Sequence, residues 1–493
     1  MLRSRFPARA LFAGARRGLA TVSESFTKTT TTTLPNGLTV ATESIPMAQT
    51  ATVGIWIDAG SRAENEKNNG TAHFLEHLAF KGTSTRSQQQ LELEIENMGG
   101  HLNAYTSREN TVYYAKSFKD DVPKTVELIS DILQHSKLAE NAIERERDVI
   151  IRESEEVDKM HEEVVFDHLH AVAFQGQPLG RTILGPRENI LTISRNELTS
   201  YIKKNYKADR MVLVGAGAVD HEGLVNLAQK NFGKLVPSDR PVAPGTGSRN
   251  PDDVPAFVGA EVRMRDDTIP TAHIAIAVEG VSWSSPDYYT ALVAQAIIGN
   301  WDRALGSAPN QGSKLSAIVS KNNLANSFLS FSTSYSDTGL WGIYLVSENK
   351  QQLDDLVYFT LKEWSRLSQS VAPEEVERAK SQLKASLLLS LDGTTAIAED
   401  IGRQIITTGR RQSPEEVERS VNAITAEDVK AWAQKYLWNK DIALAGLGSI
   451  EGLSDYKGIR ARMSPRLWLF FFFLQSEIST IREWIDPVNS RFM

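Results

Sequence analysis

The chain has 493 residues and no cysteine, and at about 150 residues per domain this length predicts two or three domains. With 41% hydrophobic and 23% charged residues, the composition excludes wholesale disorder and a polytopic membrane protein. Without cysteine, thiol nucleophiles, disulfides and Cys-bound metals are excluded, so any metal must bind His, Asp or Glu. The formal net charge of -7 argues against a nucleic-acid partner and favours basic partners.

The first 23 residues differ in charge from the rest of the chain. They contain five arginines and no Asp or Glu, interleaved with Leu and Phe. Because no long apolar core follows the charges, this composition predicts a mitochondrial transit peptide over residues 1–20 rather than a secretory signal. A disordered basic tail is the alternative. Loss of these five positive charges from a net -7 would leave a mature chain of -12.

Two strand signals follow, and a connector lies near the middle of the chain. Residues 34–43 place an Asn-Gly turn between apolar-alternating arms, which predicts a hairpin. Residues 52–60 alternate apolar Val53, Ile55 and Ile57, which predicts a half-buried strand. Residues 236–255 hold five prolines without hydrophobic periodicity, which predicts an exposed linker over 237–256. The chain would then consist of two halves, residues 29–236 and 257–460.

The two halves resemble each other in sequence. The segment from Ile193 matches the segment from Ile424 at an offset of 231, which places Gly215 on Gly446. Residues 51–60 match residues 271–280 at an offset of 220. Two matches in the same order predict a duplicated α+β domain of about 200 residues, with helices packed against a sheet in each half.

The strongest local signal is the helix-compatible run His73-Phe74-Leu75-Glu76-His77. His73 and His77 are four residues apart and share one helical face, so both imidazoles can bind one cation while Glu76 reaches an attacking water. A helix with two hydrogen-bonded histidines is the alternative. At the offset of 220, the counterparts of the three polar residues are Val293, Ala296 and Ile297. Burying polar groups where the twin has apolar ones is costly, which favours a metal.

A third metal ligand is expected in the acidic, helix-compatible segment 139–174. Glu146 and Glu153 fall on the same helical stripe as the apolar Ile143, Ile150 and Val157. Carboxylates on an apolar stripe need a compensating partner, whereas the other acids of this segment fit a solvated face. Residue chemistry alone leaves zinc and manganese open as the metal.

These motifs, together with a Glu 76 positions after the last His and a second half without the motif, resemble the pitrilysin-type or inverzincin zinc metallopeptidases. The resemblance covers roughly residues 30–460. It implies an α+β fold of two homologous halves, each a mainly antiparallel β-sheet flanked by helices. It further implies one Zn²⁺ per chain bound by His73, His77 and Glu153, with Glu76 as the general base and Glu146 behind the ligands.

Within this family, three segments are similar to the catalytic subunits that process mitochondrial presequences. They are GIWIDAGSRAENEKNNGTAHFLEHLAFKGT, GGHLNAYTSRENTVYYAK and STSYSDTGLWGIY. The resemblance implies that an edge strand containing Asn103 and Ala104 pairs with an extended substrate, although a plain sheet strand is the alternative. Glu163 and Asp167 match positions that hold the arginine before the cut site, and Tyr335 is a candidate oxyanion donor.

The implied partners are a catalytically empty alpha subunit, in a heterodimer, and basic presequence peptides. Residues 144–167 carry ten acids against four bases, which would attract such peptides. The matrix, with association at the inner membrane, is the implied location, and residues 17–20 resemble an arginine-directed cleavage site. The alternative is a structural core subunit of ubiquinol-cytochrome c reductase (complex III), or both roles in one chain. A self-contained presequence-degrading peptidase would need about twice this length.

The C-terminal segment 465–493 departs from the family pattern. Its apolar run Leu467–Leu474 has eight residues, far fewer than the roughly 20 that a membrane span needs. An exposed run of this kind is an aggregation hazard. We therefore expect a wrongly predicted exon or a lineage-specific extension.

Overall fold

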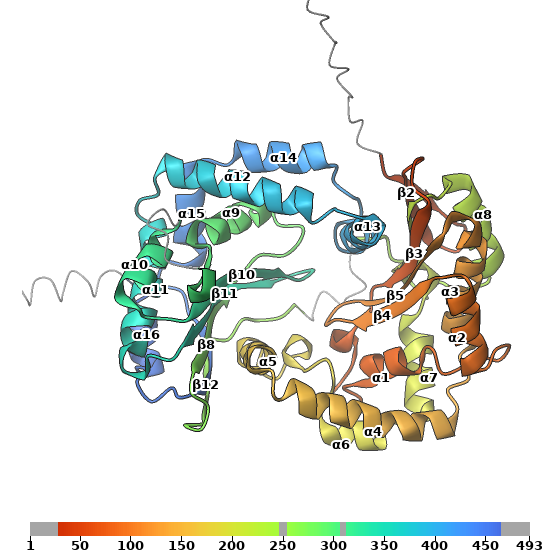
Figure 1. The fold of residues 1–493 in the computed structure, drawn as a ribbon, viewed down its shortest axis with the longest axis horizontal. Helices are drawn as coiled ribbons and strands as arrows, with labels where there is room; N and C mark the ends of the chain where they lie inside the picture. The colour runs from red at the N-terminus through yellow and green to blue at the C-terminus, as the bar shows by residue number, and fades with distance from the viewer. Residues whose placement is uncertain (1–27, 246–253, 306–311, 465–493) are drawn as a thin grey trace, which may run out of the picture.

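The computed structural model describes residues 28–245, 254–305 and 312–464. The predicted transit peptide, the middle of the predicted linker and the atypical tail lie outside these residues. Figure 1 shows two halves that each contain a β-sheet with helices, the first in red to yellow-green and the second in green to blue. Within the described residues, no helix combines the length and hydrophobicity that crossing a bilayer requires.

The first half contains a six-stranded sheet in the order β1-β2-β6-β3-β5-β4, in which the β2–β6 pair is parallel and every other pair antiparallel. Its strands are β1 (Thr30–Thr33), β2 (Thr39–Ser44), β3 (Thr50–Ile57), β4 (His101–Thr106), β5 (Thr111–Phe118) and β6 (Met211–Gly217). Its helices are α1 (Thr71–Leu78), α2 (Gln88–Asn97), α3 (Val122–His135), α4 (Glu140–Val157), α5 (His161–Ala173), α6 (Arg187–Thr192), α7 (Arg195–Asn205) and α8 (His221–Phe232).

The second half repeats this plan with the sheet order β7-β12-β8-β11-β10-β9, in which the β7–β12 pair is parallel. Its strands are β7 (Glu261–Arg265), β8 (Ala272–Glu279), β9 (Asn300–Asp302), β10 (Ser327–Ser334), β11 (Gly339–Ser347) and β12 (Ala443–Gly448). Its helices are α9 (Tyr288–Ile298), α10 (Lys314–Asn322), α11 (Leu353–Leu367), α12 (Pro373–Leu389), α13 (Thr394–Thr408), α14 (Pro414–Ala423), α15 (Ala426–Tyr436) and α16 (Tyr456–Ala461). The predicted pair of homologous, mainly antiparallel halves is confirmed.

The hairpin and the strand β3 form as the sequence predicts, but the prediction that β3 is half-buried was wrong. Both faces of β3 are buried, because α13 covers the face that carries Trp56. β1 and β2 pair antiparallel through Thr33 and Thr39, and the turn between them needs Gly37 because its φ is +91° and a Cβ there would lie 2.8 Å from that of Asp209. β3 alternates its faces: Val53 and Ile55 pack in the core under the helices, and Trp56 points to the opposite face.

The strand registers correct one detail of the predicted duplication. Val53 pairs with Gly215 in the first sheet, and Ile274 pairs with Gly446 in the second. Since the two glycines correspond at an offset of 231, Val53 corresponds to Ile274, an offset of 221. The predicted offset of 220 was wrong by one residue. A one-residue slip exchanges the two faces of a strand. Because both faces of β3 and β8 are buried and mostly apolar, the sequence gives no signal that separates the correct alignment from the slipped one.

α9 follows β8 as α1 follows β3, and it contains no His, Asp or Glu. Its buried residues are all apolar: Ala291, Val293, Ala294, Ile297 and Ile298. The helix of the second half therefore lacks the His, Glu and His that α1 carries.

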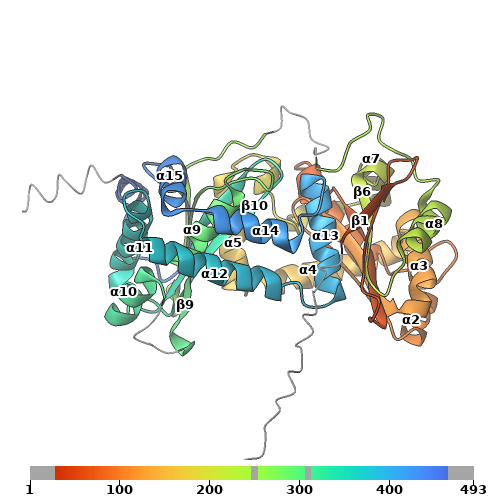
Figure 2. The ribbon, with the colours of Figure 1, turned by 90° about the horizontal axis from the view of Figure 1, so that it is seen from above.

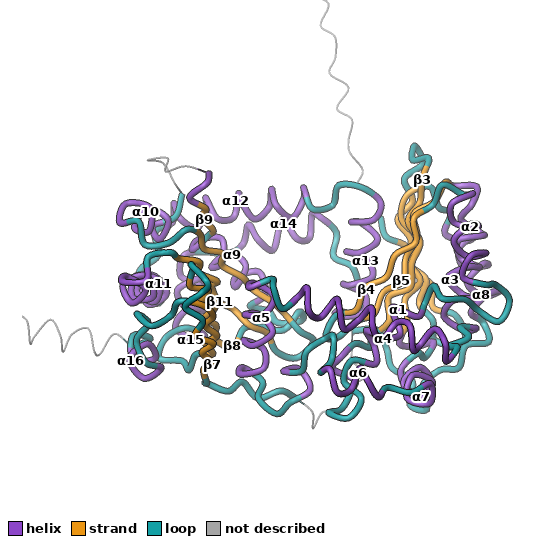
Figure 3. The backbone as a smooth tube through the Cα atoms, turned by 60° about the horizontal axis from the view of Figure 1, so that its bottom comes forward, coloured by secondary structure: helices purple, strands orange, loops and turns teal. Residues whose placement is uncertain are grey.

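Each half covers the inner face of the other half's sheet with one helix. α5 of the first half packs Leu169 against the second sheet, in a cluster with Ala275 and Leu340. α13 of the second half packs Ile401 against the first sheet, in a cluster with Trp56. α13 packs mainly on β3 and β6, and α5 packs mainly on β8 and β12. Figures 2 and 3 show α13 against the first sheet, and Figure 3 shows α5 against the second. The two halves thus share their cores through this exchange of helices.

Candidate metal centre

α1 presents the two histidines of the motif on one face, beside α4. The helix starts after Gly70, whose φ of +103° and close approach to the Leu184 carbonyl leave no room for a Cβ. One helical turn separates His73 from His77, and their ring centroids are 4.7 Å apart at an interplanar angle of 74°. His73 is buried and His77 is half-buried.

Glu153 of α4 faces both imidazoles. Its Oε2 lies 2.9 Å from Nε2 of His77, and its Oε1 lies 3.6 Å from Nε2 of His73. One ligand atom from each of the three side chains lies within 4.8 Å of the others. The structure therefore brings together the three residues that the sequence singled out, from helices about 76 positions apart in the chain.

The electrostatics of this cluster keep Glu153 ionised. Hydrogen bonds from His73 and His77 hold the pKa of its carboxyl well below the ordinary value, although partial burial acts in the opposite direction. Burial lowers the pKa of His77, but its hydrogen bond to Glu153 and the charges of Glu153, Glu146 and Glu76 outweigh burial and raise it. The cluster is thus an anionic site that favours a cation.

Glu146 lies one heptad before Glu153 on α4, behind the imidazole of His77. Its Oε2 is 3.4 Å from Nδ1 of His77, and its Oε1 forms an ion pair of 2.8 Å with Lys81. A carboxylate at Nδ1 favours the tautomer that leaves Nε2 free to bind a metal. Lys81 was not predicted, because a lone lysine after a helix looks like an ordinary surface residue.

The donor set fits a divalent metal. Two imidazole Nε2 atoms and one ionised carboxylate converge, as in catalytic zinc sites with three protein ligands. Nδ1 of the buried His73 has no hydrogen-bond partner among the described residues. Nε2 of the same ring faces Glu153, so this is the nitrogen that is placed to bind a metal.

A buried carboxylate that the sequence did not reveal fixes the start of α1. Glu64 accepts hydrogen bonds from the backbone N–H groups of Gly70 at 2.9 Å and Ala72 at 2.6 Å, and from the Asn69 amide at 2.8 Å. Burial raises the pKa of Glu64 to about 7, although these hydrogen bonds lower it in part. In sequence, Glu64 lies in the polar run GSRAENEKNNG, which reads as a solvated loop, so no local signal distinguishes it.

Glu76 and the predicted edge strand line one cleft. β4 is the last strand of the first sheet, and the cleft, of about 540 Å³, is bounded by Glu76, His77, Asn103 and Ala104 together with residues of α2. A carboxylate beside a metal cluster, at the open edge of a sheet, can take a proton from a water while an extended chain pairs with the strand.

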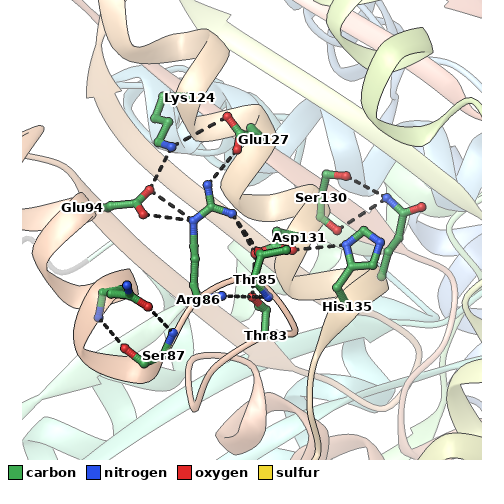
Figure 4. Close-up of polar contacts among 12 residues, drawn as sticks. Thr83, Thr85, Arg86, Ser87, Glu94, Lys124, Glu127, Ser130, Asp131 and His135 are labelled. Carbon is green, nitrogen blue, oxygen red and sulfur yellow. Dashed lines mark hydrogen bonds and ion pairs between the residues drawn. The ribbon is translucent and has the colours of Figure 1, made fainter.

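The wall of this cleft that α2 forms is braced against α3 by an ionic network (Figure 4). Arg86, in the segment before α2, contacts Glu94 at 3.1 Å, Glu127 at 2.7 Å and Asp131 at 2.8 Å. Asp131 also accepts hydrogen bonds from the hydroxyls of Thr83 and Thr85. Burial raises the pKa of Asp131, but these donors outweigh burial and lower it. The segment between α1 and α2 is therefore held in one place.

The remaining predicted residues lie between the halves. Glu163 and Asp167 project from α5; Glu163 is exposed, and Asp167 forms an ion pair of 2.5 Å with Arg108. The sequence had not indicated Arg108 as a partner. The buried Tyr335 shares a hydrogen bond of 2.7 Å between its hydroxyl and Nε2 of His170. Its predicted role as an oxyanion donor stays a prediction.

Two family models match this chain. The model described as Insulinase (Peptidase family M16) matches residues 39–187, which include the whole metal cluster, and that of the Peptidase M16 inactive domain matches residues 192–383. The chain belongs to the M16 peptidase family. This assignment agrees with the resemblance seen in the sequence. A metallopeptidase family implies a metal, and the structure contains a His-His-Glu group that could hold one.

Relatives within the M16 family are similar over almost their full lengths. Mitochondrial-processing peptidase subunit beta of Neurospora crassa is 68% identical, over 91% of this chain and 94% of that protein. The protein of the same name is 59% identical in Saccharomyces cerevisiae, over 92% of this chain and 98% of the other, and 52% identical in Homo sapiens, over 88% of both.

A solved structure shows the same architecture. A chain in complex III2 from Candida albicans, with Inz-5 bound, superimposes with a TM-score of 0.77 and 32% identity, over 88% of this chain and 99% of that one. The M16 fold therefore occurs both in peptidase subunits and in a respiratory complex.

Proposed function

We propose that this chain is the catalytic, beta-type subunit of a mitochondrial processing peptidase, a zinc metalloendopeptidase that removes N-terminal presequences near an arginine. The observation that carries the proposal is the intact set of His73, Glu76, His77 and Glu153 in a chain up to 68% identical to proteins of that name. The expected location is the mitochondrial matrix, and the expected partner is a catalytically empty alpha subunit.

The chain's own residues suit peptide hydrolysis. The imidazoles of His73 and His77 and the carboxylate of Glu153 would hold one Zn²⁺, which supplies Lewis acidity toward the peptide carbonyl and the attacking water. Glu76 takes the proton from that water and later gives it to the leaving amine. Glu146 orients His77, and the open edge of β4 aligns the substrate backbone through Asn103 and Ala104.

Acidic side chains supply the proposed preference for arginine. Glu163 and Asp167 lie four residues apart on α5, and a pair of carboxylates suits a guanidinium. Asp167 already holds Arg108 through one oxygen. The excess of acids over residues 144–167 would attract Arg-rich presequences over a longer range.

The test is cleavage by the full chain co-expressed with an alpha partner. The substrate is a synthetic peptide of residues 1–27 of this chain, which contains five arginines. The unmodified protein should bind one zinc and cut the peptide, whereas Glu76→Gln should keep zinc and lose activity by about 100-fold to 10,000-fold. A protein that binds no metal and cuts nothing would contradict the proposal.

A second candidate is a structural core subunit of complex III, which the likeness to a chain of complex III2 favours. The intact metal cluster favours the peptidase, because a purely structural subunit does not need it. Purification of the tagged chain from mitochondria distinguishes the two: co-purification with the cytochrome subunits would support the structural role, alone or in addition to cleavage.

A further inference from the structure

The edge strand β4 is held by contacts on one edge and two faces. Along one edge it pairs with β5, and its other edge has no strand partner within the described residues. One face carries Leu102 and Ala104, which pack against the helices of the first half. The opposite face carries Tyr105, which belongs to the cluster formed with α13. The second half of the chain therefore contacts the strand that would receive a substrate.

A single carboxylate of α13 makes this contact specific. The hydroxyl of Tyr105 donates a hydrogen bond of 2.7 Å to Oε1 of Glu399, and the indole N–H of Trp56 donates one of 3.1 Å to Oε2. Each oxygen of the carboxylate thus holds a different strand, β4 through Tyr105 and the central β3 through Trp56. Glu399 ties the free edge of the sheet to its centre.

Close packing of α13 on β3 holds Glu399 in place. Gly402, one turn after Glu399, lies so close to Trp56 that a Cβ would fall 2.2 Å from the indole ring. On the same helix, the hydroxyls of Thr394 and Thr395 lie 2.9 and 3.0 Å from that of Thr52 on β3. Those two contacts anchor α13 to the sheet but do not reach β4. Glu399 supplies the hydrogen bond that links the helix to the edge strand, in addition to the packing of Tyr105.

We propose that Glu399 is a positioning residue that, through Tyr105, fixes β4 in the place where it pairs with an extended substrate. The proposal rests on the proposed function, because it assumes that substrates add to β4. It gives the second half of the chain an indirect part in substrate binding, through the position of β4. A strand that is fixed in advance loses less conformational freedom when a peptide binds, so removing the contact should weaken binding more than it slows the chemical step.

The experiment compares two peptides with three variants of the full chain, each co-expressed with the alpha partner. The long peptide is residues 1–27 of this chain, and the short peptide is residues 15–23, which leaves less backbone to pair with β4. Tyr105→Phe removes the donor, and Glu399→Gln keeps the size of the acceptor without its charge. Thr52→Val is the matched control, since it removes a buried contact of α13 that does not reach β4.

Tyr105→Phe and Glu399→Gln should each raise KM for the long peptide about threefold to tenfold, as expected for one hydrogen bond. Their kcat should stay within about twofold, their zinc content should stay unchanged, and the short peptide should be affected less. Thr52→Val should change neither KM. The proposal would be overturned by an unchanged KM in both variants, or by an equal rise in the control. If the unmodified protein cleaves neither peptide, the proposed function fails and this proposal fails with it.

Discussion

The two halves of the chain share one plan, yet they place opposite kinds of side chain at equivalent positions. α1 carries His73, Glu76 and His77 beside α4, whereas α9, beside α12, has no His or Glu and buries apolar residues such as Ile298. With the starts of α4 and α12 aligned, Ala379 and Ser386 replace Glu146 and Glu153. The fold thus persists with either set, which teaches that the metal cluster is an addition to a framework stable without it.

The most direct test of this difference is to replace one residue of each helix, His77 in α1 and Ile298 in α9. On the proposed function, His77→Ala should lose bound zinc and at least about 1000-fold of peptidase activity, because it removes a proposed metal ligand. Ile298→Ala should keep zinc and activity but lose about 2–5 kcal/mol of unfolding free energy. Metal analysis, peptide cleavage and chemical denaturation measure the three quantities. Loss of zinc in Ile298→Ala would contradict the assignment of chemistry to the first half.

The exchanged helices offer the next largest effect. Leu169 on α5 and Ile401 on α13 are fully buried against the sheet of the opposite half. Each change to Ala should reduce the free energy of unfolding by about 2–5 kcal/mol, measured by chemical denaturation. Leu389→Ala is the control, because this leucine is 76% exposed. Equal losses of unfolding free energy at Leu169 and Ile401 would show that the two halves stabilise each other to the same extent. No loss at either position would show that they do not stabilise each other.

The buried Glu64 at the start of α1 should make the stability of the first half depend on pH. Because burial raises the pKa of Glu64 from 4.5 to about 7, the protonated form favours the folded chain. Stability should therefore fall as pH rises from about 4.5 through 7, by up to about 3 kcal/mol. Denaturation curves between pH 5 and 8 should show this loss in the unmodified chain and a flatter profile in Glu64→Gln.

The exposed Glu66→Gln controls for the removal of one negative charge at nearly the same place in the chain. The same pH profile in Glu64→Gln and in the unmodified chain would mean that Glu64 does not titrate in this range.

The smallest expected effect concerns the fit of α13 on the first sheet. Gly402→Ala would gain about 0.5–1 kcal/mol from helix propensity, but its Cβ would meet the ring of Trp56 at 2.2 Å. A net loss of about 1–3 kcal/mol is expected. Adding Trp56→Phe to Gly402→Ala should recover part of this loss in a thermal or chemical melt. A stabilised single variant would show that α13 can move away from the sheet.

Local patterns in the sequence predicted the parts of the molecule that depend on local geometry. The Asn-Gly turn, the alternation in β3 and the four-residue spacing of His73 and His77 each describe one element, and the structure has all three. The stripe on α4 likewise pointed to Glu153, which the structure places against both histidines.

The residues that sequence reasoning missed act through contacts between distant segments. Glu64 looks like a loop residue until its backbone donors are known, and Glu399 lies 294 positions from Tyr105. The exchange of α5 and α13 could not be predicted either, since an apolar stripe on a helix does not tell which sheet it covers. The one-residue register error has the same origin, because two apolar faces look alike in sequence.

The free edge of β4 carries a risk as well as a use. An unpaired strand edge can template association with another copy of the same chain. Here the edge lies in a cleft whose other side is formed by side chains of α2, among them Gln88, Glu92 and Glu96. These side chains would obstruct a folded sheet, which is bulkier than a single extended polypeptide. The same arrangement would therefore protect the protein from self-assembly and confine its substrates to segments that are not yet folded.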